Sequence, residues 1–151
     1  MSQQCNKENM QKWIEALRSG IYTQANGALR KPRGPIPAEY TTKFNDYAYC
    51  CLGVACELFC EEKERELDAD ADDIHYDSTD IWYDNSLLPE DVQKWLGITN
   101  SNPYLTDKFW THPAYNSETE ILTRSASSWN DDIKADFNKI ADLIEDTFLK
   151  D

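Results

Sequence analysis

Apolar side chains recur at the three- and four-residue spacing of an α-helix near both ends of the chain. The pattern predicts one helix over about 6–19, capped by Asn6 and ended by Gly20, and another over about 136–149. The inward-facing positions are Met10, Trp13, Ile14 and Leu17 in the first helix and Phe137, Ile140, Ala141, Ile144 and Phe148 in the second. Each helix therefore has one face to bury against the rest of the chain.

Two further helices are predicted in the middle of the chain. A brief strand at about 46–50 leads into a buried helix at about 51–66. Pro89, at the first helical position, opens another helix that Gly97 ends. The apolar positions are Leu52, Ala55, Cys56, Phe59 and Cys60 in the first of these helices and Val92, Trp95 and Leu96 in the second.

The remaining segments are expected to form short strands and loops. Segments 21–24 and 28–31 flank an Ala-Asn-Gly sequence, which predicts a short hairpin or tight turn, and residues 31–38 form a proline-rich loop. Residues 100–118 are expected to be a long, aromatic-rich loop or a weak strand region. The fold class is therefore α+β and mainly helical: a single domain over residues 1–151, with about four helices and a small hairpin or short sheet.

Acidic residues are concentrated between positions 61 and 84. This segment holds eleven acidic residues and only Lys63 and Arg65 as basic ones, so it carries −9 of the net charge of −13. Such a field repels nucleic acid and anionic membranes and attracts basic protein surfaces or cations. We expect a helix end followed by an acidic loop. Its candidate partner-binding residues are Asp68, Asp70, Asp72, Asp73, Asp77 and Asp80.

The hydrophobic pattern and the cysteines indicate a cytoplasmic protein. The longest uncharged apolar run, residues 47–56, is about ten residues long, well short of the ~20 that span a bilayer. Five cysteines, an odd number with two adjacent, are typical of free thiols in a reducing compartment. We therefore expect the chain to act in the cytoplasm.

Neither the cysteines nor the aspartates have the spacing of a structural metal site. Zinc draws pairs of ligands from two separate turns, and the cysteines around helix 51–66 form no such pairs, so buried thiols are expected. Alternating acids after residue 67 match the start of a calcium loop, but Asp73 stands where that loop needs glycine and Thr79 where it needs glutamate. Weak, non-selective binding of a divalent cation stays open at Asp68, Asp70 and Asp72.

The chain shows no catalytic set. A cysteine nucleophile needs a neighbouring base, and His75 and His112 are the only histidines. His75 lies in the acidic segment, where carboxylates oppose thiolate formation, and His112 has no identifiable cysteine partner. Nucleophile elbows, phosphate-binding loops and dinucleotide-binding glycine patterns do not occur. The sequence leaves enzymatic activity open, favours its absence, and indicates no catalytic residue and no cofactor.

Four different stretches, spread in order along most of the chain, carry a family resemblance. They are Trp13–Gly20 with Tyr22 and Gln24; Tyr49-Cys50-Cys51-Leu52-Gly53-Val54-Ala55-Cys56; Leu88-Pro89 with Val92 and Trp95-Leu96-Gly97; and Trp129-Asn130-Asp131 with the segment from Phe137 to Glu145. Together they resemble a family of small phage- and prophage-type proteins with no established activity. The chain departs from that pattern in its proline-rich insert 31–38 and its longer acidic stretch. The resemblance implies a phage accessory protein, or a bacterial gene of prophage descent, and no mechanism.

These features support two hypotheses. In the first, the protein acts by binding: it presents an acidic surface to a basic host protein, as an inhibitor or as a mimic whose carboxylates imitate phosphates. Direct binding of nucleic acid or of a membrane is not expected at this net charge. In the alternative, it binds a nucleotide-type anion, or is a small enzyme, at the turn where a helix begins. The residues of that alternative site are Tyr49, Cys50, Cys51, Arg18, Arg30 and Arg33.

Overall fold

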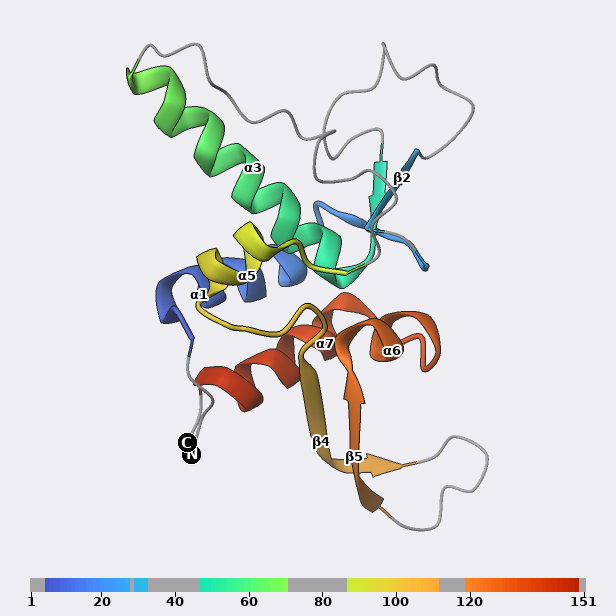
Figure 1. Cartoon of the computed structure of the whole chain (residues 1–151). Helices are drawn as coiled ribbons and strands as arrows, with labels where there is room; N and C mark the ends of the chain where they lie inside the picture. Colours follow the sequence, from blue (N-terminus) through green and yellow to red (C-terminus); the bar gives the residue numbers. More distant parts are fainter. Residues whose placement is uncertain (1–4, 28, 33–46, 71–86, 112–118, 150–151) are drawn as a thin grey trace.

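The computed structural model describes residues 5–27, 29–32, 47–70, 87–111 and 119–149 (Figure 1). In chain order the elements are α1 (Lys7–Arg18), β1 (Thr23–Gln24), β2 (Arg30–Pro32), β3 (Tyr47–Tyr49), α3 (Cys51–Asp70), α5 (Glu90–Leu96), β4 (Tyr104–Thr111), β5 (Thr119–Ser125), α6 (Ala126–Asp131), α7 (Phe137–Ile144) and the π-helical turn η2 (Glu145–Leu149). The fold class predicted from the sequence, a mainly helical α+β domain, is confirmed.

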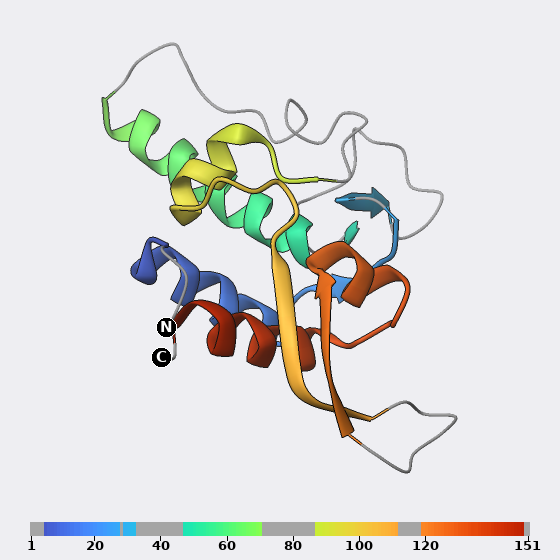
Figure 2. The same cartoon turned by 60° about the horizontal axis from the view of Figure 1, so that its bottom comes forward.

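The helices at the two ends of the chain pack against each other. α1 and α7 lie side by side in both views (Figures 1 and 2), and each buries the face that its spacing predicts. The predicted helix 136–149 is present as α7 and η2, with Asp136 accepting a hydrogen bond from the Lys139 amide at 2.8 Å. The indole of Trp13 is fully buried and donates to the carbonyl of Cys51 at 2.9 Å. This bond fixes α1 to the start of α3.

The first half of α3 is buried in the core, and the second half projects from it. All of its side chains from Cys51 to Glu57 are buried, because this half runs through the centre of the molecule. The second half extends past α1 and α5 (Figures 1 and 2). The helix ends at Asp70, four residues beyond the predicted position 66. Local pattern could not locate this end, because residues 67–70 (Leu-Asp-Ala-Asp) contain neither a glycine nor a proline that would mark it.

The first three strands form a sheet in the order β1-β3-β2. β1 pairs with β3 in parallel, and β2 pairs with β3 antiparallel, so that Arg30 stands opposite Tyr49. The predicted hairpin of 21–24 with 28–31 is therefore wrong, because β3 lies between the two strands. The amide of Ala25 donates to the carbonyl of Tyr49 at 2.7 Å, and the amide of Cys50 donates to the carbonyl of Leu29 at 3.3 Å. The backbone groups that a hairpin would pair with each other are instead hydrogen bonded to residues 49 and 50, which come later in the sequence.

A second, two-stranded sheet is an antiparallel hairpin of β4 and β5, which extends away from the helices (Figures 1 and 2). Of the two forms expected for 100–118, the strand is the one present over Tyr104–Thr111. β5 and α6 were not predicted. The side chain of Ser125 caps α6 by accepting from the amide of Ser128 at 3.3 Å.

The N-terminal end of the described chain is docked on two other helical segments. The Asn6 amide donates to the carbonyl of Leu96 at 2.8 Å, and the Cys5 thiol donates to the carbonyl of Phe148 at 3.8 Å. Gly97 ends α5 with φ of 76°, as predicted, whereas Pro89 is the cap of that helix and not its first residue. Among the described residues, no helix combines the length and apolar character needed to cross a membrane.

Candidate functional site

The side chain of Asn130 joins three of the four stretches that carry the family resemblance. It is fully buried, and its Oδ1 accepts from the amide of Cys51 at 3.1 Å and from Nε2 of Gln24 at 2.9 Å. Its Nδ2 donates to the carbonyl of Ala25 at 2.7 Å. The neighbouring Asp131 accepts from the amide of Gly27 at 3.0 Å. Because its amide oxygen and nitrogen are both bonded, Asn130 serves as a structural junction of β1, α3 and α6.

The Tyr49-Cys50-Cys51 turn belongs to the same junction. Tyr49 and Cys51 are fully buried and Cys50 is 3% exposed. The Tyr49 hydroxyl donates to the buried carboxyl group of Glu57 at 3.4 Å, and the ring of Tyr22 meets that of Tyr49 edge to face at 5.4 Å. The start of α3, expected to offer backbone donors to an anion, is capped by Asn130. The sequence identified this turn but not its partner, 79 positions away.

Of the three arginines of the alternative site, Arg18 is engaged away from the turn. Arg18 Nη2 lies 2.6 Å from Asp142 Oδ1 and 3.4 Å from Glu145 Oε1, so it joins α1 to the C-terminal helical segment. Arg30 occupies the β2 position opposite Tyr49, and Arg33 lies outside the described residues. The structure thus brings the backbone of Arg30 to the turn and engages Arg18 elsewhere.

The cysteines of α3 have the environment of packed thiols. Burial raises the pKa of Cys50 to about 11, although the backbone amides of Gly53 and Leu52 oppose that rise. Burial also raises the pKa values of Cys51 and Cys56 well above 9.0. A nucleophile or a metal ligand needs the thiolate, which these surroundings disfavour. Over the described ranges, no group of three or more His, Cys, Asp or Glu side chains could hold a metal ion.

The acidic candidates fall at the projecting end of α3 and beyond it. Asp68 and Asp70 are in the last turn of the helix, which carries no basic residue. The other predicted partner-binding residues, Asp72, Asp73, Asp77 and Asp80, lie outside the described residues, as do His75 and the proline-rich loop from residue 33 onward. A helix end carries partial negative charge on its free carbonyl groups, so the carboxylates of this turn add to a field of the same sign.

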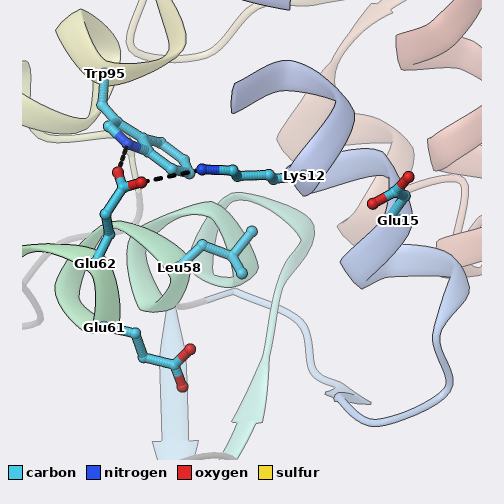
Figure 3. A pocket seen from close by; sticks show the side chains of 6 residues that line it. All are labelled: Lys12, Glu15, Leu58, Glu61, Glu62 and Trp95. Carbon is cyan, nitrogen blue, oxygen red and sulfur yellow. Dashed lines mark hydrogen bonds and ion pairs between the residues drawn. The ribbon is translucent and has the colours of Figure 1, made fainter. Parts of the chain in front are cut away.

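A hollow opens where α1, α3 and α5 meet, at the base of the projecting half of α3 (Figure 3). We call it the Glu62 hollow; its volume is about 230 Å³, and it is lined by Lys12, Glu15, Leu58, Glu61, Glu62 and Trp95. Nζ of Lys12 lies 3.0 Å from Oε1 of Glu62, and the indole N–H of Trp95 donates to the other carboxylate oxygen. Glu62 is therefore held in one orientation from two sides.

The Glu62 hollow has an excess of negative charge. Three carboxylates and one ammonium group line it. Burial raises the pKa of Glu62, but hydrogen bonds from Lys12 and Trp95 and the positive charges of Lys12 and Lys63 outweigh burial, so its pKa lies below the usual value. Burial, together with the nearby charges of Glu61 and the buried Glu57, also raises the pKa of Tyr22.

The hollow could not have been found from local sequence signals. Trp95 was predicted only as an inward-facing residue, and Glu62 only as part of the acidic segment. The helical spacing of Leu58, Glu61 and Glu62 shows that they share a face of α3. Nothing in that spacing indicates that Lys12, 50 positions earlier, and Trp95, 33 positions later, complete the hollow.

Replacing Glu62 by glutamine is expected to lower the urea midpoint of unfolding at pH 7. Because the pKa of Glu62 is depressed in the folded protein, its charge contributes stability above the unfolded pKa, near the usual value of 4.5. That contribution is lost as the pH falls through the folded pKa. The midpoints of wild type and Glu62→Gln should therefore converge below about pH 4.5. Glu120→Gln, on the exposed surface of β5, is the control; a gap independent of pH would contradict the expectation.

The fold and the hollow together define a small acidic α+β protein with a helix projecting from its core. A family model described as a domain of unknown function (DUF8296) matches residues 5–148, so the chain belongs to this family. Comparisons with curated proteins and with solved structures found no match.

Proposed function

We propose that this protein acts by binding, and that it presents the carboxylate-rich end of α3 to a basic surface of a partner protein. The observation that carries the proposal is the division of α3: one half is buried in the core, and the other extends beyond α1 and α5 (Figure 1). Residues 61–70 hold six acidic and two basic residues. A rigid anchor thus holds a negatively charged helix end outside the body of the molecule.

The charge of this helix end is unfavourable for the protein by itself. Carboxylates at a helix C-terminus oppose the helix dipole, and each such contact costs about 0.3–1 kcal/mol at an exposed site. The last turn has no basic residue to offset this cost. A basic partner surface would supply the missing positive charge, so that binding relieves a repulsion present in the free protein. This supports a binding role over a merely solvated acidic surface.

The proposed partner is a basic protein of the host cell, in particular one that binds nucleic acid. Carboxylates along an exposed helix can occupy a groove that normally accepts phosphates, and the protein would then act as a competitive inhibitor. We place this interaction in the host cytoplasm and regard the chain as a phage-type accessory protein, on the resemblance described above. Its net charge of −13 opposes direct binding of nucleic acid.

Affinity capture from a bacterial lysate at low salt, with salt elution and mass spectrometry, tests the proposal. We expect recovery of a basic protein whose binding to DNA or RNA is competed by this chain. The complex should weaken as salt rises, because screening reduces its charge–charge attraction. Capture should be lost when Asp68, Asp70, Asp72 and Asp73 become asparagine.

A matched control removes four acidic charges elsewhere. Its substitutions are Glu8→Gln, Glu90→Gln, Glu120→Gln and Asp132→Asn, all at exposed positions. This control should retain the partner. If both variants lose the partner equally, or if the complex is insensitive to salt, the protein does not bind through the end of α3.

A further inference from the structure

We propose that the Glu62 hollow is the receptor for one arginine side chain of the basic partner. This inference rests on the proposed function and names the contact that would anchor the partner. The hollow combines an indole wall, an aliphatic residue and an excess of carboxylates, which is the environment that a guanidinium group requires.

The size of the hollow favours a single side chain. Its volume of about 230 Å³ is below the ~300–1,000 Å³ of typical small-molecule sites. A nucleotide would also bring negative charge toward Glu15, Glu61 and Glu62, and Lys12 is the one basic residue among those that line the hollow. One extended cationic side chain fits both the small volume and the negative charge of the hollow.

The polar groups of the hollow have different roles in this arrangement. Glu62 is already hydrogen bonded to Lys12 and Trp95, which hold it in place (Figure 3). Glu15 and Glu61 also line the hollow, from α1 and α3, and attract an incoming guanidinium through their negative charge, although neither side chain points at the Lys12–Glu62–Trp95 cluster (Figure 3). A guanidinium is more weakly hydrated than an ammonium and donates five N–H groups in a fixed plane, so it can meet the exposed edge of Trp95, which is 8% exposed, while it bonds to a carboxylate.

The position of the hollow is continuous with the proposed binding surface. Glu61 and Glu62 line it and also begin the acidic part of α3. An arginine inserted there would fix one end of a partner whose other basic groups lie along α3 toward Asp70. This contact would fix the partner at one position along the helix, which charge attraction alone would not do.

The test uses the indole N–H signals of the five tryptophans in the 15N-labelled full-length protein. Trp95→Phe assigns the signal of Trp95, and hexa-arginine at low salt is the probe. We expect the Trp95 signal to shift saturably, whereas the signals of Trp13 and Trp129, both fully buried, stay in place and report an intact fold. Hexalysine should shift the Trp95 signal less at the same concentration.

The variant Glu15→Gln with Glu61→Gln should weaken hexa-arginine binding by about three- to tenfold, the range for two partly exposed ion pairs. The control Glu8→Gln with Glu120→Gln removes the same charge away from the hollow and should leave the affinity unchanged. An unmoved Trp95 signal, or equal weakening by both double variants, overturns the inference.

Failure of the hollow and failure of the proposed function give different results. If the captured partner still depends on salt and on the four aspartates but is indifferent to Glu15→Gln with Glu61→Gln, the binding function stands and the arginine receptor is rejected. If the captured complex ignores salt and the four aspartates while the Trp95 signal still responds to hexa-arginine, the hollow binds arginine and the acidic helix end is not the partner's surface.

Discussion

Replacing Gly53 by alanine is expected to destabilise the protein by about 3 kcal/mol or more, the upper end for overpacking. A Cβ at this position would overlap the carbonyl oxygen of Leu29 and lie 2.7 Å from its carbonyl carbon. Leu29 cannot retreat cheaply, because its carbonyl accepts from the amide of Cys50 and its side chain is fully buried. Equilibrium urea unfolding followed by circular dichroism measures the loss.

The expected change in stability has the opposite sign to the change that helix propensity alone predicts. Glycine inside a helix normally costs about 1 kcal/mol relative to alanine, so the same substitution at an open helical site would stabilise. Gly20→Ala is the control without steric overlap, because nothing lies within 4 Å of the added Cβ. Only the φ of +79° at this position is unfavourable, so this substitution should cost about 1–2 kcal/mol. A Gly53→Ala protein as stable as wild type would show that α3 and Leu29 do not pack as described.

Replacing Asn130 by alanine is expected to cost about 3–5 kcal/mol. The substitution leaves the amide of Cys51, the side chain of Gln24 and the carbonyl of Ala25 without the partner that now satisfies them. Each buried polar group that loses its partner costs about 1–3 kcal/mol, and the space left by the amide adds to the loss. The effect should appear as a lower urea midpoint and a lower melting temperature.

Asn138→Ala is the matched control for this prediction. Asn138 has the same side chain on the exposed face of α7, so its replacement should change the free energy of unfolding by less than about 0.5 kcal/mol. If Asn130→Ala were no more destabilising than Asn138→Ala, the junction of β1, α3 and α6 would not carry the stability assigned to it. The sequence stretches around Asn130 would then need a functional explanation in place of a structural one.

The helices α1, α3, α5 and α7 were predictable because each of them is encoded by neighbouring residues. The apolar spacing that predicts the helices 6–19 and 136–149 lies within one segment, and so do their caps Asn6 and Asp136. The strands were harder to predict. β1 is only two residues long, and its partner β3 lies beyond β2 in the sequence. A pattern of two residues has no periodicity from which pairing could be inferred.

The features of the candidate site also fall into those that the sequence reveals and those that it does not. The acidic segment was visible as composition, and the turn at Tyr49 was visible as a motif. Their environments were not visible, because these depend on residues distant in sequence: Asn130 closes the turn from α6, and Lys12 and Trp95 close the hollow beside Glu62. Distant contacts of this kind leave no trace in local spacing.

By itself, the sequence determined the helical segments other than α6, the α+β class and the strong negative charge, since these follow from local periodicity and composition. Only the tertiary structure decided that the Tyr49-Cys50-Cys51 turn is a buried junction and that Arg18 pairs with the C-terminal helical segment. It also decided that half of α3 is core while the other half projects. The reason is physical: burial and polar contacts depend on which segments meet, and those meetings join residues separated by tens of positions.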